Sequence, residues 1–265
     1  MQPIQSTVLL TPGGELLLLT LNRPAVLNAI DLRMAEELYA ALDVAAHDEK
    51  VRALIITGSG RGFCAGGDLR FALEANPDQP GDSFLTLTAT LHRCIELLRT
   101  MPKPVIAAIN GVAAGAGLFL ALACDLRIMA SEAYLKQSNT SYGLSLPAGG
   151  SFFLPPPLGV WRALEMGMLG APIPGERARE LGPTTQIALS TDLLDSAQRL
   201  AAQVAQMPVG TLGRVKQLMN QAFSASLAEQ LANERVALAA SANSAEGREG
   251  LAAFVAKRPP VFVAG

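Results

Sequence analysis

The sequence predicts an α/β domain with parallel strand pairing, followed by a helical C-terminal region. Strand-like and helix-like segments alternate over roughly the first 160 residues, which is typical of a parallel sheet with crossover helices. After the proline-rich stretch 154–159, nearly all apolar repeats have helical spacing. The length of 265 residues suits one large domain, with or without a short appended helical element.

The first expected elements are a hairpin and a capped helix. Apolar runs at 8–10 and 16–21 flank a Pro-Gly turn, which predicts two antiparallel strands. The segment 31–46 has apolar residues at helical spacing and begins with an aspartate suited to cap a helix. A buried strand at 51–57 then leads into the glycine-rich loop 58–68.

The remaining elements are predicted from apolar spacing and from glycine and proline positions. They are a loop at 76–83, a helix at 84–100, a strand at 104–109, a turn at 110–115, a helix at 117–123, strands at 125–131, 133–138 and 185–189, and helices at 160–170, 176–181, 192–206, 209–223 and 228–256. The alanine-rich, weakly charged faces of the last third suggest subunit contact, or else packing on their own domain.

Composition excludes several classes of function. The net charge is −2 and no basic run occurs, so no nucleic-acid partner is predicted. The apolar stretch 104–124 is nearly long enough to cross a bilayer, but Asn110 and three glycines interrupt it, and no membrane partner is predicted. No secretory signal is evident at the N-terminus.

The cysteines and histidines are too scattered to predict a metal site. Cys64, Cys94 and Cys124 lie far apart, form no CxxC pair, and are accompanied by only two histidines. An odd number of unpatterned thiols fits a reducing cytoplasm, which is the predicted location.

Two glycine loops are candidates for binding an anionic oxygen. Loop 58–68 contains Gly66 and Gly67, where a backbone can approach a ligand closely, and loop 110–117 ends where a helix begins. Two N–H groups from separate loops aimed at one oxygen form an oxyanion hole. Either loop alone is more often a plain connection, and neither matches the GxGxxG pattern of dinucleotide binding.

Taken together, several segments resemble the enoyl-CoA hydratase/isomerase (crotonase) family. They are LNRPAVLNAI at 21–30, GSGRGFCAGGDL at 58–69, KPVIAAINGVAAGAGLFLALACDLRI at 103–128, GLSLPAGG at 143–150 and EGREGLAAFVAKRPPVF at 246–262. The resemblance implies a crotonase/ClpP-like right-handed spiral of ββα units. It also implies an acyl-CoA-binding core over 1–200, and a helical region over 201–265 that forms homotrimers or dimers of trimers.

The resemblance also implies specific roles for residues. The oxyanion donors are the N–H groups of Gly67 and Ala116. Contacts with coenzyme A, which is part of the substrate and not a permanently bound cofactor, fall on the following residues: Ala25, Val26, Leu27, Ala65, Arg70, Phe254 and Lys257. The last two match tail positions that often reach the CoA of a neighbouring subunit.

This chain departs from the family where the catalytic acids usually stand. Two glutamates hold and activate a water in typical hydratases, and their positions match Phe119 and Asn139 here. A third acidic position, used by some isomerases, matches Ala148 in PAGG. None of these three side chains exchanges a proton near neutral pH, so the sequence argues against ordinary hydration.

Few replacements for those acids are available. Asn139 can still form a hydrogen bond with an acyl group or a water, and His92 lies on a helix where some relatives carry a catalytic histidine. A lone helical histidine is more often a packing or surface residue. Glu74, Asp78 and Asp82 lie on the segment that covers the acyl pocket in relatives, although a solvated loop is their commoner role.

Three functions remain open at this level. The first is an acyl-CoA enzyme that relies chiefly on the oxyanion hole, such as a decarboxylase, or an isomerase or hydrolase with non-standard residues. The second is a non-catalytic acyl-CoA-binding protein. The third, a serine-protease-like relative with the same spiral, is disfavoured because no Ser/His/Asp order is recognisable.

Overall fold

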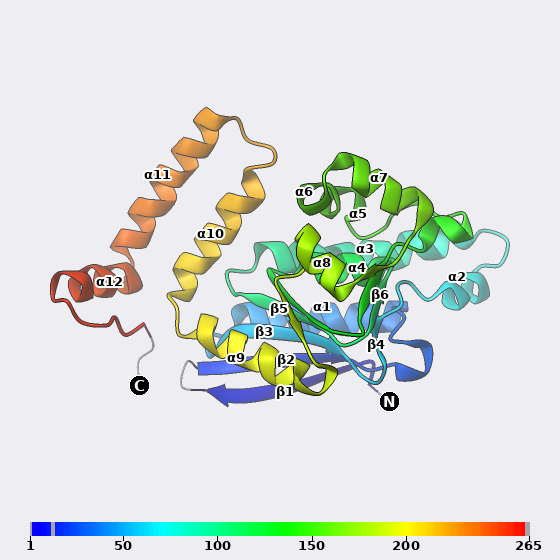
Figure 1. Ribbon diagram of the computed structural model, residues 1–265, viewed down its shortest axis with the longest axis horizontal. Helices are drawn as coiled ribbons and strands as arrows, with labels where there is room; N and C mark the ends of the chain where they lie inside the picture. Colours follow the sequence, from blue (N-terminus) through cyan, green and yellow to red (C-terminus); the bar gives the residue numbers. More distant parts are fainter. Residues whose placement is uncertain (1, 12–13, 263–265) are drawn as a thin grey trace.

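The computed structural model describes residues 2–11 and 14–262, which form two sheets surrounded by helices (Figure 1). The larger sheet has the strand order β1 (Ile4–Thr11), β2 (Gly14–Leu21), β3 (Val51–Gly58), β5 (Val105–Ile109), β7 (Leu126–Ala130) and β10 (Gln186–Ala188). The smaller sheet has the order β4 (Gly62–Cys64), β6 (Val112–Ala114), β8 (Tyr134–Lys136) and β9 (Ile173–Pro174).

The helices fall between and after these strands. They are α1 (Leu32–His47), α2 (Leu69–Ala75), α3 (Pro80–Thr100), α4 (Ala116–Ala123), α5 (Gly150–Phe153), α6 (Pro155–Leu158), α7 (Val160–Leu169), α8 (Gly175–Leu181), α9 (Leu193–Ala205), α10 (Val209–Gln221), α11 (Leu227–Asn243) and α12 (Ala245–Val255). Short 3₁₀ turns are η1 (Pro24–Val26), η2 (Asn139–Tyr142) and η3 (Ser190–Asp192).

The chain order confirms the expected right-handed spiral of ββα units. Strand β3 leads into β4, β5 into β6, and β7 into β8, so each pair gives one strand to each sheet before helices follow. From β2 to β10, neighbouring strands of the larger sheet are parallel, as the alternation in the sequence predicted. The glycine turns that follow β4 and β6 therefore lie at equivalent places in successive turns of the spiral.

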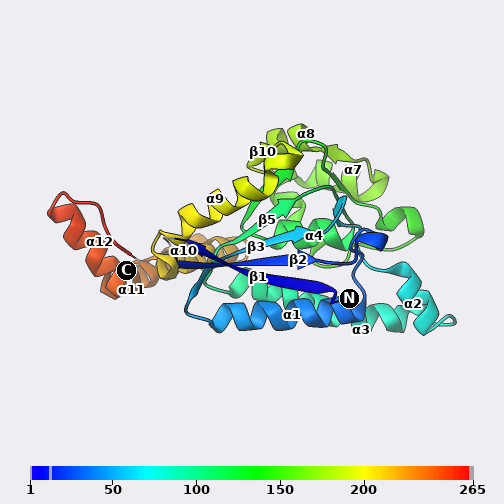
Figure 2. The ribbon, with the colours of Figure 1, turned by 90° about the horizontal axis from the view of Figure 1, so that it is seen from below.

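The core is the larger sheet between two helical layers. Helices α1 and α3 cover one face and α9 covers the other, as the view from below shows (Figure 2). Strand β5 is buried at every position and β3 at nearly every one, which is typical of parallel strands covered on both faces. Because α9 packs on the sheet, the core extends to Ala205.

Most expected elements are confirmed. Strands β1 and β2 form the antiparallel hairpin, although its Pro-Gly turn falls on residues 12–13, outside the described residues. Helix α1 begins at Leu32, and the Asp31 side chain accepts a hydrogen bond from the Met34 N–H at 2.8 Å, as an N-cap does.

Several expectations need correction. Helix α3 begins at Pro80 rather than at 84, because proline suits the first helical position and Asp82 lies in the favourable first turn. Helix α2 was not predicted, and strands β4 and β6 fall within the expected loop 58–68 and turn 110–115, since all three elements are too short for a clear periodic pattern. The single helix expected over 228–256 is divided at Ser244, whose side chain caps α12 by accepting the Gly247 N–H at 3.0 Å.

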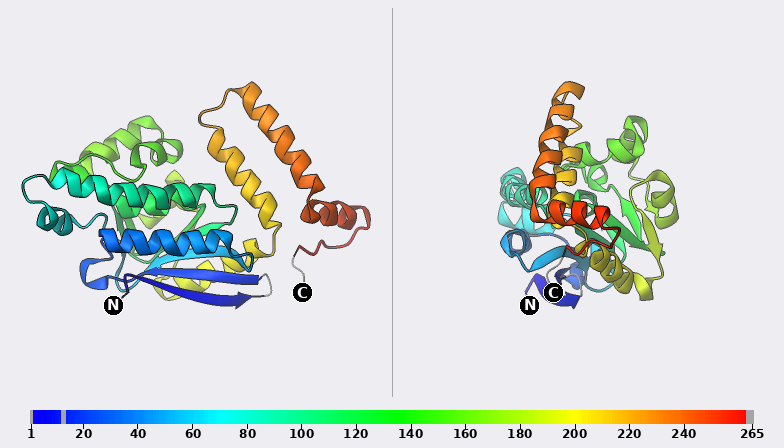
Figure 3. Two further views of the ribbon diagram at one scale, coloured as in Figure 1. Left: turned by 180° about the vertical axis from the view of Figure 1, so that it is seen from behind. Right: turned by 90° about the vertical axis from the view of Figure 1, so that its left-hand side faces the viewer.

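Helices α10 to α12 form a C-terminal arm, residues 209–262, that extends away from the core (Figures 1 and 3). Its base is held by Lys216, whose Nζ lies 2.8 Å from the Asp125 Oδ2, and by Asn220, whose Nδ2 donates to the Arg99 carbonyl at 2.8 Å. Burial lowers the pKa of Lys216, and the Asp125 charge opposes that effect. Helix α12 packs on α10 and α11.

The apolar stretch that resembled a membrane span forms β5, β6 and α4. Among the described helices, none combines the length and apolar character needed to cross a bilayer.

The arm depends on a close contact at Gly213, and this gives a stability prediction. A β-carbon on Gly213 would lie 2.7 Å from the Pro102 Cα, whereas one on Gly167 of α7 would meet no atom within 4 Å. Alanine normally stabilises a helix by roughly 0.5–1 kcal/mol relative to glycine. We therefore expect Gly167→Ala to raise the free energy of unfolding and Gly213→Ala to lower it in urea titrations. Equal stabilisation by both variants would contradict this packing of α10.

Candidate functional site

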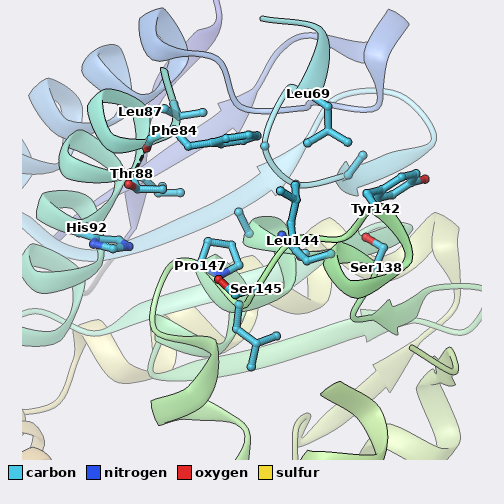
Figure 4. Close-up of a pocket in the computed structure, with 18 residues that line it drawn as sticks. Leu69, Phe84, Leu87, Thr88, His92, Ser138, Tyr142, Leu144, Ser145 and Pro147 are labelled. Atoms are coloured by element: carbon cyan, nitrogen blue, oxygen red, sulfur yellow. Dashed lines mark hydrogen bonds between the residues drawn. The ribbon is translucent and has the colours of Figure 1, made fainter. Parts of the chain in front are cut away.

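One cavity of about 330 Å³ lies where the two glycine loops meet helix α3 and the segment 138–147 (Figure 4). Its volume is at the small end of the range of about 300–1,000 Å³ that ligand pockets occupy. The residues that line it are Ala65, Gly66, Gly67, Leu69, Phe84, Leu87, Thr88, Leu91, His92, Gly115, Ala116, Ser138, Asn139, Tyr142, Leu144, Ser145, Leu146 and Pro147.

Each of the two predicted donor amides follows a glycine with a positive φ. Gly66 has φ +110° and precedes Gly67, while Gly115 has φ +48° and precedes Ala116. Residues with a β-carbon rarely adopt these angles, so glycine is needed to turn the following peptide. Within the described part of the chain, neither following amide donates a hydrogen bond. Both residues line the cavity, so two unpaired donors border one space.

The two loops touch each other because small residues meet there. A β-carbon on Gly66 would lie 3.4 Å from the Ala116 nitrogen, and one on Gly117 would lie 2.3 Å from the Cys64 carbonyl oxygen. Cys64 is fully buried, and burial raises the pKa of its thiol to about 12. The thiol therefore acts as a small apolar filler behind the loop, and not as a nucleophile.

Backbone and side-chain contacts hold the first loop in place. The Ile30 N–H donates to the Gly66 carbonyl at 2.7 Å, and the Asp68 N–H donates to the Ile30 carbonyl at 2.8 Å, so both neighbours of Gly67 are fixed. Asp68 also caps α2 and pairs with the Arg23 guanidinium at 2.9 Å. Asp68 is thus a structural residue of this loop, and sequence reasoning missed its partner Arg23.

Asn28 fixes the other end of the same loop. It is fully buried, and its Nδ2 lies 3.0, 2.8 and 3.2 Å from the carbonyl oxygens of Ser59, Gly62 and Phe63. Its Oδ1 accepts the Arg23 N–H at 2.8 Å. This amide therefore ties the segment before α1 to the glycine loop.

Asn139 lies on η2 and borders the cavity beside the second loop. Its Oδ1 is buried and has no hydrogen-bond partner among the described residues, and a β-carbon on Gly115 would lie 2.8 Å from it. The oxygen is therefore turned toward the loop backbone. The Nδ2 of Asn139 also makes no hydrogen bond to the described residues, and it is the half of the amide left for the cavity.

His92 borders the cavity from α3, and its ring points toward the segment that carries Pro147 (Figure 4). Its Nε2 accepts the Ala148 N–H at 3.2 Å, so Nε2 carries no proton and Nδ1 is the N–H donor of the neutral ring. His92 is thus a bracing side chain for the turn at Ala148 as well as part of the cavity wall.

Phe119 and Ala148 lie behind the cavity wall. The Phe119 ring is fully buried, and a β-carbon on Gly150 would lie 2.5 Å from it, so the ring fills the space between α4 and α5. Ala148 is 1% exposed and has φ +52°, and the wall at this turn is formed instead by its neighbours Leu146 and Pro147. The three acids considered as replacements, Glu74, Asp78 and Asp82, are all exposed and outside the cavity lining.

The residues expected to contact CoA fall into two groups. Ala65 lines the cavity, Ala25 and Val26 are exposed on η1 with Leu27 directly after it, and Arg70 is exposed on α2. Phe254 and Lys257 lie on or just after α12 at the far end of the arm, where the Phe254 side chain is 83% exposed. In the first group the Ala65 N–H donates to the Leu27 carbonyl at 2.9 Å, whereas the second group lies at α12, which stands away from the core at the end of the arm (Figure 3).

The apolar wall on α3 was missed by sequence reasoning, although a signal for it was present. Phe84, Leu87, Thr88, Leu91 and His92 have the spacing of one helical face, and all five line the cavity. The predicted helix 84–100 already contained all five residues. Their spacing marks one apolar face, but it does not show whether that face meets a cavity or the core.

Comparison with known proteins gives a consistent result. A sequence profile described as Enoyl-CoA hydratase/isomerase matches residues 13–264. The 1,2-epoxyphenylacetyl-CoA isomerase of Escherichia coli K12 is 40% identical, with 92% of this chain and 93% of that protein covered. The 2,3-dehydroadipyl-CoA hydratase of the same organism is 33% identical, covering 97% and 98%. A crystal structure of an enoyl-CoA hydratase from Polaromonas sp. JS666 superposes with a TM-score of 0.91 at 39% identity, covering 97% and 98%.

The buried Asn28 amide gives a prediction for the site. Asn28→Ala removes the donor shared by three carbonyl groups, and an unsatisfied buried group costs about 1–3 kcal/mol. We expect the free energy of unfolding to fall by at least that amount. The control is Asn233→Ala, because Asn233 is exposed and donates only to the Gln221 side chain, so a change within about 0.5 kcal/mol is expected. Similar stabilities for the two variants in urea titrations would refute this role of Asn28.

Proposed function

This chain belongs to the enoyl-CoA hydratase/isomerase family, and on that premise we propose that it is an enzyme that stabilises the enolate of an acyl-CoA thioester. The observation that carries the proposal is the pair of unpaired amides, Gly67 and Ala116, which border one cavity after glycines with positive φ. A thioester carbonyl oxygen seated between them accepts both hydrogen bonds.

The two amides favour charge on that oxygen. When an α-bond of the acyl group breaks and its electron pair stays with carbon, the charge moves onto the thioester oxygen as an enolate. Fixed N–H donors stabilise that charge without reorganising, and one such donor is worth about 3–4 kcal/mol in the transition state. The N-terminus of α4 adds a favourable helix dipole beside Ala116.

The cavity favours reactions that need little acid–base help from the protein. None of its described lining residues is an aspartate or a glutamate, which supports the proposal that Phe119, Asn139 and Ala148 replace the usual acids. Decarboxylation of a malonyl-type thioester meets this condition. The bond to the carboxylate breaks, CO₂ leaves, and the enolate then takes a proton from water. Isomerisation with His92 or Asn139 as the nearby polar group is the alternative, and the likeness to an E. coli isomerase supports it.

The coenzyme A part of the substrate extends from the cavity along the first loop in this proposal. Ala25, Val26 and Leu27 flank it, the Ala65 backbone meets the adenine, and Arg70 meets a phosphate. These residues surround one loop, and Arg70 is exposed on α2. No permanently bound cofactor is needed, and the three described cysteines, all buried and unpaired, suit a cytoplasmic location.

The arm completes the site of a second copy in the proposed assembly. The proposed assembly is a homotrimer, and two trimers can pair into a hexamer. Each chain has a core over 1–200 and a C-terminal helical region over 201–265. Large apolar side chains along the arm have no cover in the single chain, among them Leu231, Leu238, Leu251, Phe254 and Val255. Phe254 and Lys257, remote from their own cavity, then reach the CoA bound by a neighbour.

The amide of Gly67 provides the first test of this function. Gly67→Pro deletes one N–H, so we expect weaker binding of a thioester such as hexanoyl-CoA in titration calorimetry. Binding of a hexyl-CoA thioether, which lacks the carbonyl oxygen, serves as the control and is expected to change little. Unchanged thioester affinity in this variant would count against the oxyanion role of Gly67.

Loss of the usual acids leads to a second prediction. Positioned acid–base groups contribute about 10²–10⁴-fold to rate, so we expect crotonyl-CoA hydration at least about 100-fold slower than in an enzyme with both glutamates. Comparable turnover would show that the positions of Phe119 and Asn139 were matched wrongly.

A panel of CoA esters separates an enzyme from a binding protein. We expect mass spectrometry to detect a product from at least one malonyl-, enoyl- or aroyl-CoA ester, with the Gly67→Pro variant as the control for the site. Binding of several esters without any product would favour the non-catalytic alternative.

A further inference from the structure

The side chains that line the acyl end of the cavity offer hydrogen-bonding groups but no carboxylate, ammonium or guanidinium. Asn139 and His92 contribute nitrogens, and Ser138, Tyr142 and Ser145 contribute hydroxyls. Five leucines and Phe84 are part of the wall, and none of the described lining residues is Asp, Glu, Lys or Arg. A carboxylate placed in such a space loses its hydration and meets no opposite charge. The wall therefore disfavours acyl groups that end in a carboxylate.

The amide of Asn139 presents a donor to this space. Its Oδ1 is buried against the loop at Gly115, and no water-accessible face of that oxygen remains. The Nδ2 has no partner among the described residues. An amide nitrogen only donates hydrogen bonds, so a substrate atom that pairs with it must be an acceptor.

His92 also contributes a hydrogen-bond donor to the cavity. Its Nε2 accepts the N–H of the buried Ala148 at 3.2 Å, which leaves Nδ1 as the free N–H. Because Nε2 already accepts from that amide, Nδ1 is the ring nitrogen that can donate to a ligand in this arrangement.

The third polar side chain on α3 is already engaged. The Thr88 hydroxyl donates to the Phe84 carbonyl at 2.6 Å within the helix, so its hydrogen is not available to a ligand. Asn139 and His92 are thus the two side chains, among these three, with an uncommitted N–H at the cavity.

We propose that this site selects uncharged, largely apolar acyl groups that carry a hydrogen-bond-accepting oxygen near the thioester. The inference rests on the proposed function, because it assumes that the cavity holds the acyl part of a CoA thioester. Of the two reactions considered there it favours isomerisation, because the acyl group of a malonyl-type thioester ends in a carboxylate. A ketone, ether-type or hydroxyl oxygen meets the donors of Asn139 and His92, while the rest of the acyl group contacts the leucines.

Three six-carbon esters and free CoA test the selection by titration calorimetry on the full-length protein. Hexanoyl-CoA is apolar, 3-oxohexanoyl-CoA adds one acceptor oxygen, and adipoyl-CoA ends in a carboxylate. One added hydrogen bond is worth about threefold to tenfold in affinity, so 3-oxohexanoyl-CoA should bind that much more tightly than hexanoyl-CoA. Adipoyl-CoA should bind at least about tenfold more weakly than hexanoyl-CoA, because its carboxylate is unpaired.

Matched variants assign the preference to its source. Asn139→Leu should reduce or abolish the advantage of 3-oxohexanoyl-CoA and retain hexanoyl-CoA binding, which also reports that the variant folds. Thr88→Val is the control, and the advantage should persist because the Thr88 hydroxyl is engaged within α3. A 3-oxo ester that owed its affinity to enolate formation at the Gly67 and Ala116 amides would keep its full advantage in Asn139→Leu and overturn the role of Asn139.

The outcomes also separate this inference from the function beneath it. If hexanoyl-CoA binds no more tightly than free CoA, the cavity does not hold the acyl group and the proposed function fails as well. If hexanoyl-CoA binds tightly and adipoyl-CoA binds equally well, the function stands and the selection for uncharged acyl groups is wrong.

Discussion

The architecture of the site depends on the close approach of two backbone turns, one after β4 and one before α4. Gly66 and Gly115 adopt positive φ there. Gly117 leaves room for the Cys64 backbone, because a β-carbon on Gly117 would lie only 2.3 Å from the Cys64 carbonyl oxygen. The spiral brings the turns together because β4 and β6 are neighbours in the smaller sheet. Arg23, Asn28 and Asp68 then hold the first turn from behind. Side chains thus supply the frame, while backbone amides border the cavity.

The two turns and the rest of the cavity wall have separate roles in our proposal. In our proposal the loop amides bind the thioester carbonyl, which all acyl-CoA substrates share, whereas α3 and the segment 138–147 contact the acyl group that differs between them. The described lining residues of these two segments include no Asp, Glu, Lys or Arg, and the His92 ring accepts a hydrogen bond from the Ala148 amide. In our proposal the chemistry therefore relies on electrostatic stabilisation at the loops, and specificity relies on the helix wall.

Much of this was accessible from the sequence. Alternating apolar segments predicted the parallel sheet, and Gly66, Gly67, Gly115 and Gly117 marked the two turns, because glycine permits close backbone approach. The sequence predicted the helix that carries Phe84 and Leu87, but neither its start at Pro80 nor that this face lines the cavity. Tertiary contacts decided the rest: the Phe119 ring lies behind the wall against Gly150, and the Asn139 oxygen is turned toward Gly115. Neither orientation has a local signature in the chain.

The thioester carbonyl itself is the most direct reporter of the central claim. Isotope-edited infrared spectroscopy of a ¹³C=O-labelled acyl-CoA measures its stretching frequency in water and when bound to the protein. Two converging N–H donors polarise the C=O bond more than water does, so the account predicts a lower frequency in the bound state. A bound thioester whose carbonyl frequency equals or exceeds that in water would contradict it, since the Gly67 and Ala116 amides would then not share that oxygen.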